Sequence, residues 1–299
     1  MFHHLVRGLV RTVAVPAFVI ACTTFVVGWS QSDRTTAPKA WNVPRTPAGH
    51  PDLQGVWTDY DPTPFERPNG TEPQGERLVV STQDWLVQPG PRSARRPSMV
   101  IDPPDGRVPL RPEAAEKRDR DLAEPNDSLL RYGPWERCIT RGVPGSIFPG
   151  AYNNGHQIVQ TADHVVIHSE MIHEARVIPT DGRPHLSPIL RSWEGDSRGR
   201  WEGETLVVDI VHQNGKSWLD QQGRFGTGAL HVVERFAFVD EDTMHFQATI
   251  DDPNVYTRPW TVAFPLNRDD NYQLFEYACH EGNHALENML RLGATERLR

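Results

Sequence analysis

Residues 230–250 read LHVVERFAFVDEDTMHFQATI, two stretches of alternating residues joined by the acidic turn Asp240-Glu241-Asp242. Every second residue from 230 to 238 is apolar except Glu234, and every second residue from 244 to 250 is apolar without exception. Alternation with a period of two predicts strands with one buried face. The short turn between the two stretches predicts an antiparallel hairpin.

Similar patterns on both sides of this hairpin extend the prediction to a whole sheet. Further short apolar or β-branched runs occupy residues 157–160, 165–170, 175–178, 205–211, 256–266 and 272–279. About eight short strands with tight connections favour a closed barrel or a strongly curved antiparallel sheet. We therefore expect a mainly β, lipocalin-like fold with mostly antiparallel strands from residue 150 onward, and no helix longer than about 20 residues.

The N-terminal third of the chain has a different composition. The chain contains 26 Pro and 23 Gly, and prolines are frequent between residues 51 and 130. Only residues 111–130 have a helical pattern. Because proline interrupts regular structure, we predict a Pro-rich arm over residues 33–130, with a first strand and a short helix. This arm would wrap an antiparallel β core at 131–299.

The expected first strand begins with Asp52-Leu53-Gln54-Gly55-Val56-Trp57. Gly-x-Trp at the start of a first strand resembles the opening of lipocalins and other calycins, where the Trp closes one end of the barrel. The alternative is an ordinary strand with a buried Trp.

Residues 1–32 have the pattern of an export signal. Arg7 and Arg11 precede 18 residues, 12–29, that carry no charge. A basic segment followed by an apolar one is typical of secretion signals, so we expect a periplasmic or membrane-anchored protein. Three outcomes stay open: lipidation of Cys22, cleavage near residues 29–32, or an uncleaved anchor, since 18 residues just span a bilayer. Membrane contact is expected through this segment only.

Two cysteines remain beyond the signal, Cys138 and Cys279. In an oxidising compartment two leftover cysteines most simply pair. Closing a loop of 141 residues would stabilise the fold by roughly 4–5 kcal/mol, less any strain. Two unpaired cysteines are the alternative.

The net charge and the motifs that the sequence lacks limit the classes of function to consider. The net charge is -8 and no Lys/Arg-rich tract occurs, which argues against a nucleic-acid partner. The sequence shows no Gly-x-Gly-x-x-Gly motif, no Walker loop and no Gly-x-Ser-x-Gly elbow, so we predict no cofactor. A small-molecule ligand or substrate is the expected partner.

Several segments resemble an uncharacterised family of exported bacterial proteins. The matching segments are PDLQGVW (51–57), ERCI (136–139), QIVQT (157–161), EMIHEAR (170–176), DGRPH (181–185), GDSRGRWEG (195–203), VERF (233–236), TRPW (257–260) and YACHEGN (277–283). The resemblance covers most of the mature chain and implies export. The resemblance implies no particular reaction and identifies no catalytic residue.

We predict that Glu170, His173, Arg176 and His280 converge on one cavity. A carboxylate beside an imidazole suits proton transfer, and a guanidinium of Arg176 or Arg258 can stabilise developing negative charge. Glu170 and His173 fall on opposite faces of an extended strand, so convergence requires a bulge near residues 171–172. The structural alternative is a hydrogen-bonded pair without a catalytic role.

A loop is expected at residues 196–201, which read DSRGRW and combine turn residues with two guanidinium groups. Such a loop can bind a carboxylate, a sulfate or sugar hydroxyls. The alternative is a structural cap on the barrel, held by an Arg–Asp pair.

A second set of residues is predicted to bind the substrate, through aromatic faces and polar loop groups. The set is Asn154, His156, Trp193, Arg258, Trp260 and Tyr277. The leading hypothesis is an exported, cofactor-independent lyase, hydratase, isomerase or cyclase. The alternatives are a periplasmic binding protein without turnover and a metal-dependent hydrolase that uses His173, His280 and Glu281, although we predict no metal site.

Overall fold

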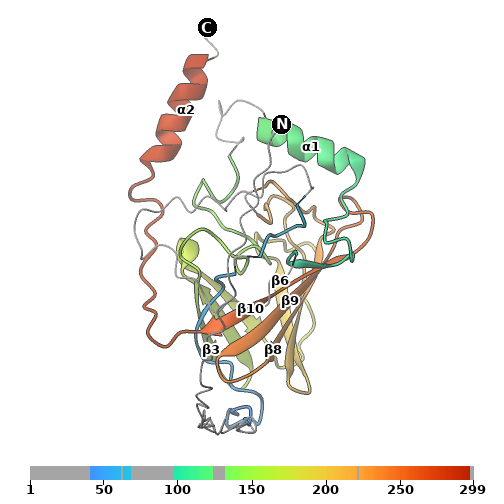
Figure 1. Cartoon of the computed structure of the whole chain (residues 1–299), viewed down its shortest axis with the longest axis vertical. Helices are drawn as coiled ribbons and strands as arrows, with labels where there is room; N and C mark the ends of the chain where they lie inside the picture. The colour runs from blue at the N-terminus through green and yellow to red at the C-terminus, as the bar shows by residue number, and fades with distance from the viewer. Residues whose placement is uncertain (1–40, 62, 69–96, 124–131, 221, 297–299) are drawn as a thin grey trace, which may run out of the picture. The chain divides into compact units, whose positions relative to one another are not determined.

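The computed structural model describes residues 41–61, 63–68, 97–123, 132–220 and 222–296 (Figure 1). The chain divides into residues 1–40 and a compact unit that begins at Trp41. The expected export signal, with Cys22, lies outside the described residues. All elements and contacts given below belong to the compact unit.

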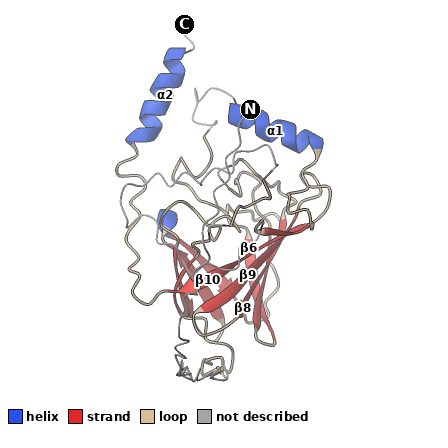
Figure 2. Cartoon of the chain, in the orientation of Figure 1, coloured by secondary structure: helices blue, strands red, loops and turns tan. Residues whose placement is uncertain are grey.

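The compact unit is built on one antiparallel sheet of ten strands, in the order β5-β4-β3-β1-β10-β9-β8-β7-β6, with β2 also paired to β10. Figure 2 shows the strands gathered together, with the two helices beyond one end. The strands are β1 (Gly55–Thr58), β2 (Val100–Asp102), β3 (Gly155–Gln160), β4 (His164–Ser169), β5 (Glu174–Pro179), β6 (Asp196–Glu202), β7 (Thr205–Val211), β8 (His231–Phe238), β9 (Thr243–Asp251) and β10 (Trp260–Arg268).

The sheet is nearly closed into a barrel, because its two end strands approach each other. A Cβ atom added at Gly199 of β6 would lie 2.8 Å from Cγ2 of Thr180 and 3.0 Å from Cγ2 of Ile178, at the end of β5. Only a residue without a side chain allows this approach. The prediction of a mainly β, lipocalin-like antiparallel fold is confirmed.

The hairpin predicted at residues 230–250 forms the centre of the apolar core. β8 pairs with β9, and β9 with β10, so that Phe236, Phe246 and Phe264 lie side by side across three strands. Their ring centroids are 5.1 and 5.0 Å apart, and all three side chains are fully buried. Aromatic pairs of this kind contribute about 0.5–1.5 kcal/mol beyond burial alone.

β1 lies inside the sheet, between β3 and β10. The ring of Trp57 is fully buried, its Nε1 donates to the carbonyl oxygen of Leu53 at 2.9 Å, and the guanidinium of Arg268 lies 4.5 Å from the ring. Gly55 has a φ of +136°, and a Cβ there would come 2.5 Å from Nη1 of Arg268. The Gly-x-Trp pattern therefore brings the chain close to Arg268 and places a Trp against it.

Two helices and one short turn complete the described elements. α1 (Pro112–Ala123) falls in the predicted helical segment, α2 (His284–Glu296) follows the last strand, and η2 (Met171–His173) joins β4 to β5. Within the described ranges no helix has the length and apolar character that crossing a membrane requires.

Two sequence-based expectations about strands were wrong. Residues 272–279 form no strand, because this segment is held by contacts with the side chains of Glu170 and His173 and not by a strand edge. Conversely, the loop expected at residues 196–201 is part of β6. This strand pairs with β7 along seven residues, so tertiary pairing overrides its weak intrinsic strand preference.

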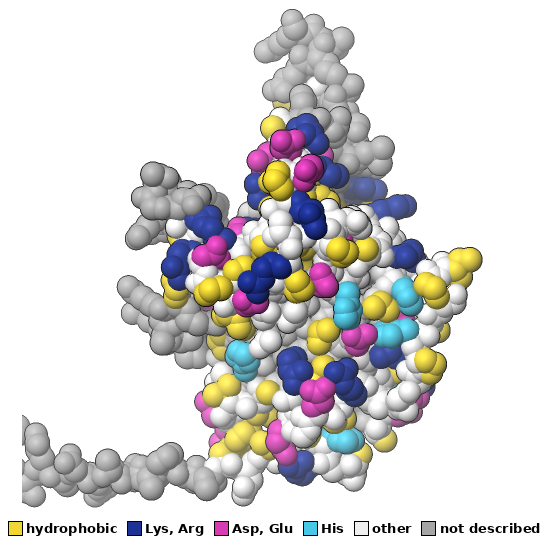
Figure 3. Space-filling model, turned by 90° about the vertical axis from the view of Figure 1, so that its right-hand side faces the viewer, with side chains coloured by type: hydrophobic (Ala, Val, Ile, Leu, Met, Phe, Trp, Pro, Cys, Tyr) yellow, Lys and Arg dark blue, Asp and Glu magenta, His cyan; other side chains and the backbone are white. Residues whose placement is uncertain are grey.

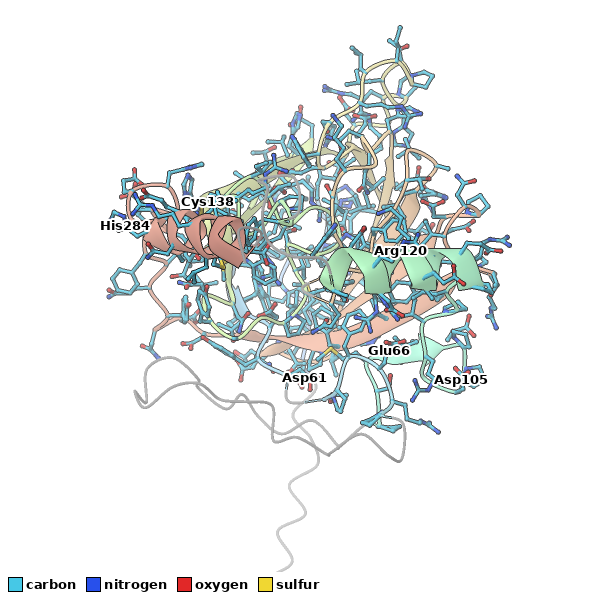
Figure 4. All side chains as sticks on the ribbon, turned by 90° about the horizontal axis from the view of Figure 1, so that it is seen from above. Asp61, Glu66, Asp105, Arg120, Cys138 and His284 are labelled. Atoms are coloured by element: carbon cyan, nitrogen blue, oxygen red, sulfur yellow. A yellow bond between two sulfur atoms is a disulfide. The ribbon has the colours of Figure 1, made fainter. Side chains whose placement is uncertain are left out.

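The predicted disulfide between Cys138 and Cys279 is present, with Cα atoms 5.6 Å apart. Figure 4 shows Cys138 beside the start of α2, near His284. Asn283 strengthens the junction, because its Nδ2 donates to the carbonyl oxygen of Glu136 at 3.0 Å. The bridge ties the segment after β10 to the segment before β3.

The close approach of β5 and β6 predicts the effect of a small substitution. Gly199→Ala should lower the free energy of unfolding by about 1–3 kcal/mol, because the added methyl group overpacks the barrel interior. Gly282→Ala is the control, since a Cβ there meets nothing within 4 Å. Urea denaturation of both variants tests this, and equal midpoints would contradict the close β5–β6 contact.

Candidate functional site

Polar and charged side chains gather inside and at one end of the barrel, and we call them the inner polar cluster. They come from strands and from the segments that precede or follow strands. The cluster consists of Asp59, Thr140, Arg141, His156, Ser169, Glu174, Arg176, Glu194 and Glu234.

One part of the inner polar cluster is a chain of three buried groups. Nδ1 of His156 lies 3.0 Å from Oγ of Ser169, which faces it from the neighbouring strand β4. Nε2 of His156 lies 3.4 Å from Oδ2 of Asp59, and all three residues are at most 2 % exposed. Among the described residues Nε2 of His156 and the carboxylate oxygens of Asp59 have no hydrogen-bond partner, so only the contact between His156 and Ser169 is a hydrogen bond. The burial of Ser169 keeps its hydroxyl from a substrate.

A second part is a buried ion pair that crosses the barrel interior. Nη2 of Arg176, on β5, lies 2.6 Å from Oε2 of Glu234, on β8. Glu234 is the one charged residue on the apolar face of the hairpin at residues 230–250. A buried charge must be paired, and Arg176 supplies that pair.

The third part is a pair of half-buried carboxyl groups, Glu174 and Glu194, whose side chains interact with each other. Glu174 also accepts a hydrogen bond from the hydroxyl of Thr140, and its Oε2 lies 3.4 Å from the backbone nitrogen of Arg141. Burial and the contact with Glu174 raise the pKa of Glu194 to about 9, against the opposing charge of Arg176.

The inner polar cluster contains more acidic than basic groups, which adds to the burial that raises the pKa of Glu194. Four carboxyl groups share the cluster with two guanidinium groups and one imidazole. Burial lowers the pKa of Arg141 to about 10, although the charges of Asp59 and Glu174 oppose this change, so the guanidinium stays charged near neutral pH. A protonated carboxyl group beside a second carboxyl group places a proton donor next to a proton acceptor.

Glu170 and His173 have a different role, because they hold the segment that follows β10. Glu170 is buried, accepts a hydrogen bond from the hydroxyl of Tyr272, and accepts another from the backbone nitrogen of Phe275 at 3.1 Å. Nδ1 of the exposed His173 lies 2.9 Å from the carbonyl oxygen of Tyr277. We call residues 269–279 the C-terminal strap.

The four predicted catalytic residues therefore do not share one cavity. Arg176 points into the barrel, Glu170 is buried under the C-terminal strap, and His173 and His280 are exposed. The predicted irregularity near residues 171–172 is present as η2, in which Ile172 has a φ of 60°. It forms the turn between two strands and leaves His173 outside.

The predicted substrate-binding residues are also dispersed. His156 lies in the inner polar cluster, whereas Asn154 is buried and exchanges two hydrogen bonds with the backbone of Gly150. Trp260 is fully buried in the apolar core. Trp193 is half-buried, and Arg258 pairs with Asp102 at 2.5 Å on the surface.

Tyr277 is the predicted binding residue that lines a pocket. This pocket has a volume of about 470 Å³, within the range of small-molecule sites. Trp135 and Glu136 also line a recess of about 10 Å³ that includes Thr140 and Arg141 of the inner polar cluster. The lining residues of the pocket are Trp135, Glu136, Tyr152, Glu276, Tyr277, Ala278, Cys279, Gly282, Asn283, Ala285 and Met289.

Histidine and acidic side chains also meet on the outside of the protein, as the face in Figure 3 shows. Both ring nitrogens of His185 lie 2.8 Å from carboxylate oxygens, one of Asp196 and one of Asp209, and His231 lies 2.7 Å from Asp209. Burial opposes ionisation of Asp209, but hydrogen bonds with His231 and His185 outweigh it and lower its pKa. In the part of the chain that the structure describes, no group of three His, Cys, Asp or Glu residues is arranged to hold a metal ion.

The fold and the inner polar cluster define an antiparallel β-barrel protein with ionisable groups inside one end. A comparison of the sequence with protein-family models and with curated proteins found no match. The family resemblance therefore stays a prediction, and the geometry of the site is the basis for a function.

Sequence reasoning missed Glu174, Glu194, Thr140 and Arg141 as site residues. Three of them lie in irregular segments and the fourth at a strand end, where periodicity gives no orientation. Glu234 was the sequence feature that could have indicated this cluster, because a carboxylate on an apolar strand face requires a buried partner.

Proposed function

We propose that the protein is an exported, cofactor-independent enzyme that acts on a small organic molecule by general acid–base catalysis. Glu194 is its proton donor and Glu174 its proton acceptor. The observation that carries this proposal is the pair of interacting, half-buried carboxyl groups beside two guanidinium groups.

The geometry supports proton transfer in both directions. Near neutral pH Glu194 holds a proton, because its pKa is raised to about 9. Glu174 accepts hydrogen bonds and can take a proton from a substrate. Arg141 and Arg176 supply fixed positive charge that stabilises an anionic transition state. Elimination, hydration, isomerisation and cyclisation all fit these groups.

Export is part of the proposal and has a separate support. The disulfide between Cys138 and Cys279 is compatible with an oxidising compartment, since such bonds are rare where thiols are kept reduced. Peptide mapping of protein isolated from its native compartment, without reductant, tests this. Free thiols at both positions would contradict it.

Solvent exchange tests the catalytic proposal on a panel of candidate substrates. The purified protein is incubated in D₂O with small carbonyl, hydroxy and unsaturated acids, and deuterium incorporation is followed by mass spectrometry. We expect exchange into at least one compound, and a loss of about 100-fold or more in Glu194→Gln and Glu174→Gln. Glu281→Gln, on an exposed turn, is the matched control and should retain full exchange.

A second property of Glu194 can be measured on the protein alone. Between about pH 4.5 and 9 the folded state holds a proton on Glu194 that the unfolded state has released. Stability therefore falls as the pH rises through this window, by at most about 1.4 kcal/mol per pH unit. Glu194→Gln should flatten this fall in denaturation curves, and an unchanged slope would show that Glu194 is ionised in the folded protein.

A binding protein without turnover is the second candidate, favoured by the pocket of about 470 Å³ beside the disulfide. If no compound exchanges but a ligand binds in this pocket, the acid–base proposal fails and the binding function stands.

A further inference from the structure

The charged residues that line the pocket beside the disulfide are acidic, which favours ligands of one charge. Its walls come from three separate parts of the chain: residues 135–136, Tyr152, and the stretch from the C-terminal strap into α2. The Cys138–Cys279 bridge joins two of these parts covalently. The pocket is therefore a built feature of the fold and requires no ordering of a free tail.

Aromatic rings provide the apolar surface of this pocket. Tyr152 and Tyr277 are stacked with ring centroids 6.4 Å apart, and their hydroxyl oxygens are 3.4 Å apart. Burial and the contact with Tyr152 raise the pKa of Tyr277, so its ring stays neutral. Trp135 adds a third ring, although the guanidinium of Arg141 already lies 4.0 Å from it.

The charges that line the pocket have one sign. Glu136 and Glu276 contribute carboxyl groups, and the lining includes no Lys, Arg or His among the described residues. Oε2 of Glu136 is buried and has no hydrogen-bond donor in the same described part of the chain. That oxygen lies toward Gly133 and Trp218, which line the recess of about 10 Å³, so the charge that a ligand meets in the pocket comes from Glu276 and the rest of the Glu136 carboxyl group.

We propose that this pocket binds an organic cation, an ammonium group attached to an apolar or aromatic body. The carboxylates of Glu136 and Glu276 attract the ammonium group, and the rings of Tyr152 and Tyr277 receive both the cation and the apolar body. An anion of the same size meets two carboxyl groups in the lining, whereas the nearby guanidinium of Arg141 lies against Trp135 and is not part of the lining. The inference does not depend on turnover at the Glu174–Glu194 pair.

Calorimetric titration of the full chain with three compounds of similar shape tests the proposal. The compounds are 2-phenylethylammonium, the neutral 2-phenylethanol and the anionic 3-phenylpropanoate, each at low ionic strength. We expect the cation to bind at least about tenfold more tightly than the alcohol, and the anion to show no binding. Equal binding of cation and alcohol, preference for the anion, or no binding of any compound would overturn the proposal.

Variants locate the binding in this pocket. Glu136→Gln and Glu276→Gln should each weaken the cation about three- to tenfold, while binding of the alcohol stays within about twofold. Glu281→Gln removes the same charge at a position outside the pocket lining and should change neither. Glu194→Gln should also bind the cation normally, which separates this result from the catalytic test. Unchanged cation affinity in the Glu136→Gln, Glu276→Gln double variant would show that the cation binds elsewhere.

Discussion

Arg176→Met is expected to lower the free energy of unfolding by about 3–5 kcal/mol. The substitution leaves the carboxylate of Glu234 inside the barrel without its counter-charge. The exposed fraction of the Glu234 side chain is 0 % and that of Arg176 is 6 %, so water cannot replace the lost partner. Equilibrium denaturation in urea measures the loss.

The double variant Arg176→Met, Glu234→Leu should recover most of this stability, because two apolar groups of similar volume can replace a buried ion pair. Arg235→Met is the matched control on the same strand as Glu234. Its partner is Glu202, and both side chains are more than a third exposed, so the expected loss is below about 1 kcal/mol. A double variant as unstable as the single one would show that the pair does not act as a unit.

Removal of the disulfide is expected to have a similarly large effect. Cys138→Ala, Cys279→Ala should lower the free energy of unfolding by about 4–5 kcal/mol, because the bridge spans 141 residues and restricts the unfolded chain. The same variant should lose binding of 2-phenylethylammonium, since the C-terminal strap forms one wall of the pocket. Denaturation with and without reductant provides an independent measurement.

Reductant should destabilise the wild-type protein by the same amount and leave the double variant unchanged. Equal stability of the oxidised wild type and the variant would contradict a restriction of the unfolded chain by the bridge. If stability falls but cation binding persists, the strap is held by Glu170 and His173 alone, through their contacts with Tyr272, Phe275 and Tyr277.

The strands were largely predictable because their faces differ in polarity. Strict alternation at 244–250 gave β9 almost to the residue, since one face of it packs in the core. The disulfide was predictable from the count of cysteines together with the expected export, which leaves Cys138 and Cys279 in an oxidising compartment. By contrast, β6 alternates weakly, and its partners, β7 on one side and the end of β5 on the other, are specified by barrel closure.

The site was harder to predict for a related reason. Glu174 and Glu194 are far apart in sequence, and their contact depends on how the two end strands approach each other. Periodicity placed Glu234 on the apolar face of its strand but could not name Arg176 as its partner. Glu170 was a reasonable catalytic candidate by residue type, yet its two hydrogen bonds to the C-terminal strap appear only once that segment is placed.

The position of β1 has a consequence for how the protein is made. Trp57 pairs with His156 on one side and with Arg268 on the other. The first strand in the sequence, β1, can therefore complete its pairing only after the last strand, β10, has been synthesised. Contacts this distant in sequence slow folding, and the barrel cannot be completed while the ribosome still holds residues 260–268. Until then the edges of β1 and β9 that pair with β10 are open to other chains. A nascent chain of this protein should therefore depend on a holding chaperone up to its release.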